Sequence, residues 1–141
     1  MRERRLRAGI GLLGMGNLGL GAWQAVFPGS FFRTLGGFGA ENEHYIRDSA
    51  TLYAALGVVL LVAASKASWR PPVLFFALLQ GVLHLANHVA DAGSSHPGWT
   101  GPLDVVLLAG TALVFGVALV ESRRIARGSG PGSGPPARGA G

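Results

Sequence analysis

The hydrophobic residues of this chain fall into four long runs separated by short polar segments. The runs cover residues 6–27, 45–65, 73–91 and 103–121, and each is close to the length of about 17–25 residues that a helix needs to cross a bilayer. A helix that is apolar on all sides belongs in lipid or at the centre of a much larger protein. We therefore predict an all-α, integral membrane four-helix antiparallel bundle, formed by residues 1–127.

The basic residues indicate how such a bundle is oriented. Ten of the twelve lie at the start of the first run, between the second and third runs, or after the fourth. Only Arg33 and Arg47 lie on the opposite side, in or just after the connection between the first and second runs. Under the positive-inside rule, both termini then face the cytoplasm in a multi-pass protein of the cell membrane. The first run is expected to be retained rather than cleaved as a signal peptide. The glycine- and proline-rich residues 128–141 are predicted to be a disordered cytoplasmic tail.

The composition excludes several classes of function. Only 13% of the residues are charged, against about 25% in soluble domains. The net charge of +5 comes from arginines at helix ends, where they meet anionic headgroups, rather than from a basic face interleaved with aromatic residues. Nucleic acid is therefore excluded as a partner. The chain has no cysteine, which excludes disulfides, thiolate metal sites and thiol redox chemistry.

The segment after the first run is too apolar to extend into water. Residues 28–44 contain three phenylalanines, and we expect them to lie at the membrane interface, with a short helix at Ser30–Leu35 capped by Ser30. The many glycines of the first run predict close helix packing. Asn17 and Gln80, isolated among apolar residues, are expected to form hydrogen bonds between helices.

Polar side chains gather at the predicted outer ends of the second and third helices. The spacings i, i+3, i+4 and i, i+3, i+4, i+7 place each group on one helical face. The predicted ligand-binding cluster consists of His44, Arg47, Asp48, His84, Asn87, His88 and Asp91. Asp104 begins the fourth run on the same side. Ionisable groups within a bilayer are costly and indicate function by default.

Because the second helix runs inward from its polar group and the third runs outward to its own, the two groups are expected to meet. Specifically, we predict that His44 or Arg47 contacts His84, His88 or Asp91. Three interpretations of the cluster are open. It is a structural network of hydrogen bonds, a metal or haem site with His44, His84, His88 and Asp91 as ligands, or a pocket for a small anionic or lipidic ligand held by Arg47.

These observations predict a class of protein rather than a reaction. We predict a non-enzymatic membrane subunit or small-ligand binder, and the alternative is a metal- or haem-binding oxidoreductase that uses His44, His84 and His88. The sequence identifies no cofactor. The expected partners are the lipid bilayer and either another membrane protein or a second copy of the chain.

Part of the sequence resembles a known family. The matching segments are WQAVFPGSFFRTLGGFG, NEHYIRDSATLYAALGVVLLVAA and HLANHVAD, which lie between Trp23 and Asp91. They resemble the small four-helix membrane proteins of high-GC bacteria that are distantly similar to the DoxX-like superfamily. This chain has Ser49-Ala50 where the family often has glycine after the Arg-Asp pair. The resemblance implies a four-helix bundle in the cytoplasmic membrane and gives no activity.

Overall fold

The computed structural model describes residues 1–128, so the predicted tail lies outside the described residues except for Gly128. All regular elements within 1–128 are helical, which confirms the all-α prediction, and the short helix after the first run is present. The α-helices are α1 (Arg2–Val26), α2 (Pro28–Thr34), α3 (Glu43–Ser65), α4 (Arg70–Asp91) and α5 (Thr100–Gly128), and the 3-10 turns are η1 (Ala67–Trp69) and η2 (Ala92–Ser94).

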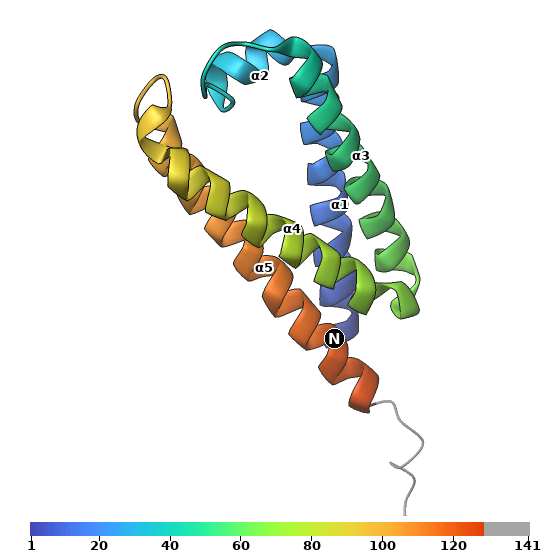
Figure 1. Cartoon of the computed structure of the whole chain (residues 1–141). Coiled ribbons are helices and arrows are strands. Elements are labelled where there is room, and N and C mark those ends of the chain that lie inside the picture. Colours follow the sequence, from blue (N-terminus) through green and yellow to red (C-terminus); the bar gives the residue numbers. More distant parts are fainter. Residues whose placement is uncertain (129–141) are drawn as a thin grey trace, which may run out of the picture.

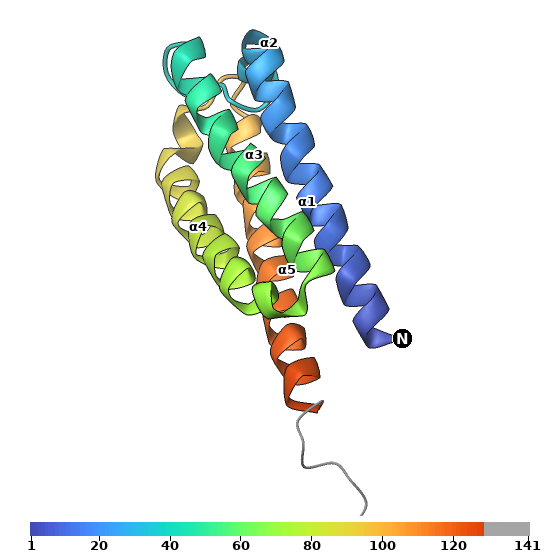
Figure 2. The same ribbon diagram turned by 90° about the vertical axis from the view of Figure 1, so that its right-hand side faces the viewer.

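The four long helices form two antiparallel pairs, α1 with α3 and α4 with α5 (Figures 1 and 2). The pairs lie together at one end of the molecule and diverge toward the other (Figure 1). The first end carries the N-terminus, the α3–α4 turn and the end of α5, and we call it the basic end (residues 1–7, 66–70 and 121–128). The other is the loop end (residues 27–44 and 92–100), where α2 and the α4–α5 connection lie.

A hydrophobic core joins the two pairs near the basic end. Every long helix contributes to it, through residues such as Ile10, Leu60, Leu74 and Phe115, each at most 2% exposed. The core does not extend to the loop end, because the helix pairs have separated there (Figure 1). The space between α3 and α4 toward the loop end is therefore available for polar groups.

Glycine allows α1 and α3 to pack with their backbones nearly in contact. A Cβ added to Gly57 would lie 2.9 Å from the carbonyl oxygen of Gly14, and one added to Gly21 would lie 2.9 Å from that of Ala50. Small residues are how membrane helices achieve such close approach, as the sequence predicted. Asn17 was expected to bond to another helix, but its amide donates to Leu13 O of α1 itself at 2.8 Å.

Capping and proline explain where the helices begin. Asn42 Oδ1 accepts a hydrogen bond from the Tyr45 backbone N–H at 3.1 Å, which caps α3 as asparagine does at many helix starts. Pro28 opens α2 at a position where a missing N–H costs nothing. The predicted cap at Ser30 is wrong, because α2 begins two residues earlier. The Ser30 hydroxyl instead accepts from Trp23 Nε1 at 3.3 Å.

The basic end is closed by a buried arginine. Arg70, 3% exposed, donates to Glu3 of α1 at 2.9 Å and to the backbone oxygens of Ala63 and Ala64 at 3.0 and 3.4 Å. These two carbonyls belong to the last turn of α3, where no further helical N–H reaches them. One guanidinium therefore joins the starts of α1 and α4 to the end of α3.

The outer surfaces of the helices are strongly apolar. Val106 and Leu113 are each 68% exposed, and Leu83 is 60% exposed. Three helical segments are long and apolar enough to cross a membrane, namely Glu43–Ser65, Ala67–Ser94 and Thr100–Gly128. α1 and α2 meet the same criterion only as a pair, which is bent by 112°.

Candidate functional site

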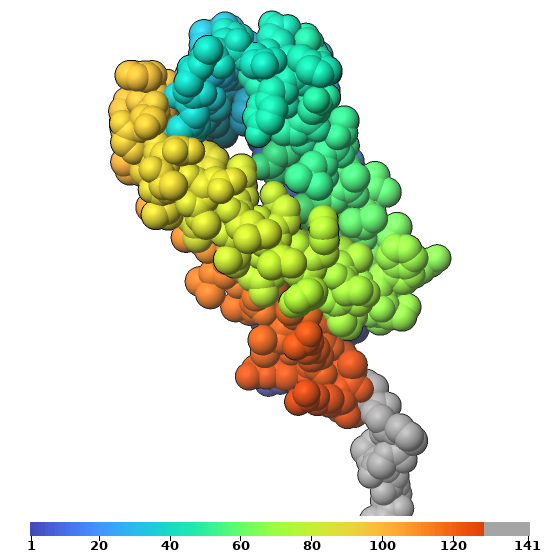
Figure 3. Space-filling model, viewed as in Figure 1, coloured from blue at the N-terminus to red at the C-terminus, as the bar shows by residue number. Residues whose placement is uncertain are grey.

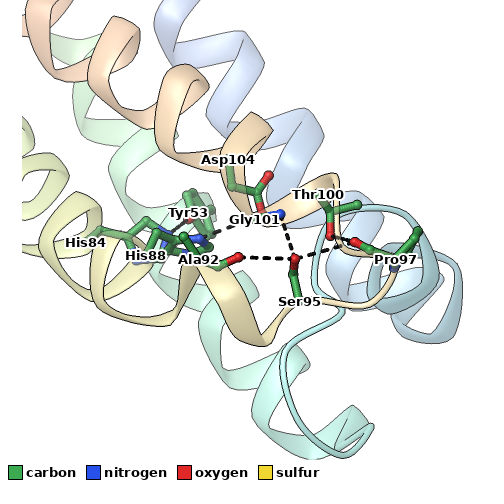
Figure 4. Close-up of polar contacts among 9 residues, drawn as sticks. All are labelled: Tyr53, His84, His88, Ala92, Ser95, Pro97, Thr100, Gly101 and Asp104. Atoms are coloured by element: carbon green, nitrogen blue, oxygen red, sulfur yellow. Dashed lines mark hydrogen bonds and ion pairs between the residues drawn. The ribbon is translucent and has the colours of Figure 1, made fainter.

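Two connections meet at the loop end and hold the start of α5 in place. Ser95, 3% exposed, accepts a hydrogen bond from the Gly101 N–H at 2.9 Å and donates to the carbonyls of Ala92 and Pro97 at 3.5 and 3.4 Å (Figure 4). Gly101 packs against the Ala92 carbonyl so closely that a side chain would not fit. This arrangement fixes the first turn of α5, which carries Asp104.

The segment between α2 and α3 folds over the same region. The His96 N–H donates to Gly37 O at 2.8 Å, and Phe38 forms an isolated bridge with Ser95. Gly37 lies against the His96 carbonyl, again too close for a Cβ. The Phe38 ring is thereby placed edge-on against His88, with a centroid separation of 4.8 Å.

Four polar residues from three helices come together beneath this cover, and we call them the polar site: Tyr53, His84, His88 and Asp104 (Figure 4). The Tyr53 hydroxyl of α3 and His84 Nε2 of α4 form a hydrogen bond at 3.3 Å. The two imidazole rings pack edge to face, 4.6 Å apart. His88 Nδ1 then faces Asp104 Oδ2 of α5 at 3.7 Å.

The His88–Asp104 pair is buried but not hydrogen-bonded. The two side chains are 20% and 8% exposed, and within residues 1–128 neither His88 Nδ1 nor Asp104 Oδ2 has a hydrogen-bond partner. A separation of 3.7 Å is too long for a hydrogen bond between nitrogen and oxygen. Leaving such a group unsatisfied costs about 1–3 kcal/mol. Both atoms have almost no accessible surface, so a third polar group would reach them only after neighbouring side chains move.

An apolar groove lies between α3 and α4 on the side of the polar site that faces the basic end. It has a volume of about 700 Å³ and is lined by residues that include Leu52, Val59, Val73 and Phe76. The space-filling view also shows the surface hollowed between these two helices (Figure 3). None of the four polar-site residues lines this groove, and Leu52 and Tyr53, although adjacent in α3, point about 100° apart around the helix.

The predicted meeting of the two polar groups does not occur. His44, with a side chain 88% exposed, pairs with Asp48 at 3.4 Å, and Arg47 pairs with Glu43 at 2.9 Å, both within the first turns of α3. The physical reason is the divergence of the helix pairs, which moves the start of α3 away from α4. His84 meets α3 at Tyr53 instead, nine residues beyond His44, or about 13 Å along the helix.

Of the four residues that were predicted to form the α4 part of the cluster, only two lie in the polar site. His84 and His88 lie in the polar site, whereas Asn87 and Asp91 are exposed. The predicted metal ligands His44, His84, His88 and Asp91 do not converge, and within residues 1–128 no group of three or more His, Cys, Asp or Glu side chains is arranged to hold a metal ion. The carboxylate that faces His88 is Asp104, not Asp91.

Sequence reasoning did not assign three members of this region to the site, although it placed Asp104 on the same side of the membrane. Tyr53 and Phe38 carried no signal, because aromatic residues in apolar segments usually serve packing. Asp104 carried a usable signal, since a carboxylate four residues into an apolar helix needs a partner. Gln24, 1% exposed, was also missed, and it accepts a hydrogen bond from the Ser49 hydroxyl between α1 and α3.

Comparisons with known proteins add no further constraint on the site. No protein-family model, curated protein or solved structure matches the chain. The DoxX-like resemblance thus stays a prediction from the sequence, and a functional argument must rest on the residues described above.

Proposed function

We propose that the protein is an integral membrane protein with four spans, both termini in the cytoplasm and the loop end on the outer side. Three apolar helices of spanning length support the membrane placement. The orientation is supported by the arginines and Lys66 of the basic end, against Arg33 at the loop end and Arg47 in the adjoining start of α3. Reporter fusions test this topology. A periplasmic reporter should be active at Ser95 and inactive at Gly128, and the reverse pattern would refute it.

We further propose that the polar site binds a small molecule and that the protein is a binder or subunit rather than an enzyme. The observation that carries this proposal is the buried His88–Asp104 pair, whose facing atoms are 3.7 Å apart and unpartnered. A bound polar group that lies to one side of the pair, within hydrogen-bonding distance of both atoms, would satisfy both once neighbouring side chains move.

The electrostatics of the polar site define the ligand class. Asp104 is its acid, and Arg47, which would have held an anion, is engaged by Glu43 at the exposed start of α3. An anionic ligand would therefore face the Asp104 carboxylate, which has His88 and no arginine or lysine beside it, in a medium of low dielectric constant. We propose a neutral or positively charged ligand with an N–H or O–H group that donates to Asp104, while Tyr53 and the histidines complete its hydrogen bonds.

Co-purification tests the proposal. The full chain and the variants Asp104→Asn and Asp91→Asn are purified in a mild detergent, and bound compounds are extracted and identified by mass spectrometry. Asp104→Asn keeps the size of the side chain but replaces an acceptor oxygen with an amide donor, whereas Asp91 is exposed. We expect a stoichiometric amine or alcohol with the wild type and Asp91→Asn, and none with Asp104→Asn.

Elemental analysis of the same samples, and of a fourth variant, His84→Ala, separates this proposal from the metal alternative. Stoichiometric metal in the wild type that disappears in His84→Ala would overturn the small-molecule proposal. Equal retention of one compound by all three proteins would place its binding elsewhere.

A further inference from the structure

A second groove lies between α1 and α5 at the basic end. It has a volume of about 450 Å³, and its walls are apolar along most of its length, formed by residues such as Leu6, Leu13, Leu113 and Val117. Gly9 also lines it, and a Cβ added there would meet nothing within 4 Å. The groove is therefore open along its floor and distinct from the polar site.

The mouth of this groove is positively charged. Arg2 and Arg5 line it, both exposed, and Glu121 of α5 also lines it, so that the three groups carry one net positive charge. Within residues 1–128 neither arginine forms an ion pair. The nearby acids are already engaged, since Glu3 lies 2.7 Å from buried Arg70 and Glu121 lies 3.9 Å from Arg124. The charge of the two arginines is thus available to an external anion.

The length of the groove matches one leaflet of a bilayer. From Arg2 to Leu13 is eleven residues of α1, or about 16 Å at 1.5 Å per residue. Half of a hydrocarbon core of about 30 Å is about 15 Å. A groove with a cationic mouth and an apolar channel of this length fits a phospholipid whose acyl chain runs along α1.

We propose that the α1–α5 groove is a binding site for one anionic phospholipid, with the phosphate between Arg2 and Arg5 and an acyl chain packed over Gly9. Basic pockets between membrane helices bind anionic headgroups in this way. This inference rests on the membrane placement in the proposed function but not on the ligand of the polar site. The lipid would lie in the leaflet that the basic end faces.

The headgroup is tested with charge-matched variants. Full-length protein in detergent is titrated with phosphatidylglycerol or with phosphatidylcholine of the same chains, and bound lipid is counted by mass spectrometry of the intact complex. At about one kcal/mol per basic residue near the headgroup, Arg2→Gln/Arg5→Gln should weaken phosphatidylglycerol binding about 30-fold. Arg4→Gln/Arg7→Gln removes the same charge from residues that do not line the groove, and should weaken binding clearly less, because only the general attraction of the basic end for anionic lipid is reduced.

The acyl chain is tested separately by filling the groove. Gly9→Leu should displace about two methylenes and weaken both lipids about tenfold, whereas Gly16→Leu, equally open but outside the groove, should leave binding unchanged. Equal losses in the two arginine pairs, equal affinity for both lipids in the wild type, or unchanged binding in Gly9→Leu would each overturn the proposal. Reporter fusions that reveal a different topology would instead contradict the membrane placement.

Discussion

Replacing Arg70 with methionine should destabilise the fold more than any other single change at the basic end. Methionine keeps most of the aliphatic volume but removes all the donors of a side chain that is 4% exposed. Ala63 O loses a hydrogen bond of 3.0 Å, and Ala64 O loses a longer one of 3.4 Å. At about 1–3 kcal/mol for each buried acceptor left unsatisfied, with the longer bond counted at the lower end, the unfolding free energy should fall by about 2–4 kcal/mol.

The ion pair between Arg70 and Glu3 should contribute much less to the unfolding free energy than the bonds from Arg70 to the α3 carbonyls. The Glu3 side chain is 52% exposed, and in Glu3→Gln the amide oxygen can still accept a hydrogen bond from Arg70, so Glu3→Gln should cost less than Arg70→Met. Unfolding is followed by far-ultraviolet circular dichroism in mixed micelles of increasing dodecyl sulfate content. Arg123→Met, at an exposed position, is the control and should change stability by less than about 0.5 kcal/mol. A loss in Arg70→Met no larger than that in Glu3→Gln would refute the role given to the α3 carbonyls.

Two further predictions use the same unfolding assay, and a third uses the rate at which the co-purified compound is released. Gly57→Ala should lower the unfolding free energy by about 1–3 kcal/mol, because its Cβ would lie 2.7 Å from the Leu18 side chain. Gly110→Ala has open space around it and should not destabilise the protein. Equal effects of the two changes would contradict the close α1–α3 packing. Tyr53→Phe should cost about 0.5–1.5 kcal/mol by removing the bond to His84, and a loss of zero would show that this bond does not form. Phe38→Ala uncovers His88 and should speed release of the compound bound at the polar site; an unchanged release rate would show that Phe38 is no cover.

The helices were predictable from the sequence because their signals are local. Proline at the start of α2 and in the first turn of α4, and asparagine before α3, act on residues within one turn. The pairing of His84 with His88 was predictable for the same reason, since residues four apart share a helical face.

The partners of these histidines depend on tertiary structure that no local pattern encodes. The expectation that His44 and Arg47 would reach α4 assumed helices in contact along their full length. The core instead joins the pairs only near the basic end, so Tyr53 and Asp104 complete the polar site. Arg70 shows the same limit, because its charge predicted a position near the cytoplasmic boundary but not its burial against α3.

The central claim is that His88 and Asp104 form a ligand site rather than a structural bond, and the double variant His88→Leu/Asp104→Val tests it most directly. Its unfolding free energy is compared with that of the wild type after bound compounds have been removed by extensive detergent exchange. Because the facing atoms are buried and unpartnered without a ligand, apolar replacements of similar size should leave stability unchanged or raise it by about 1–4 kcal/mol. A loss of about 3 kcal/mol or more would contradict the account, because it would show that the pair holds the fold together.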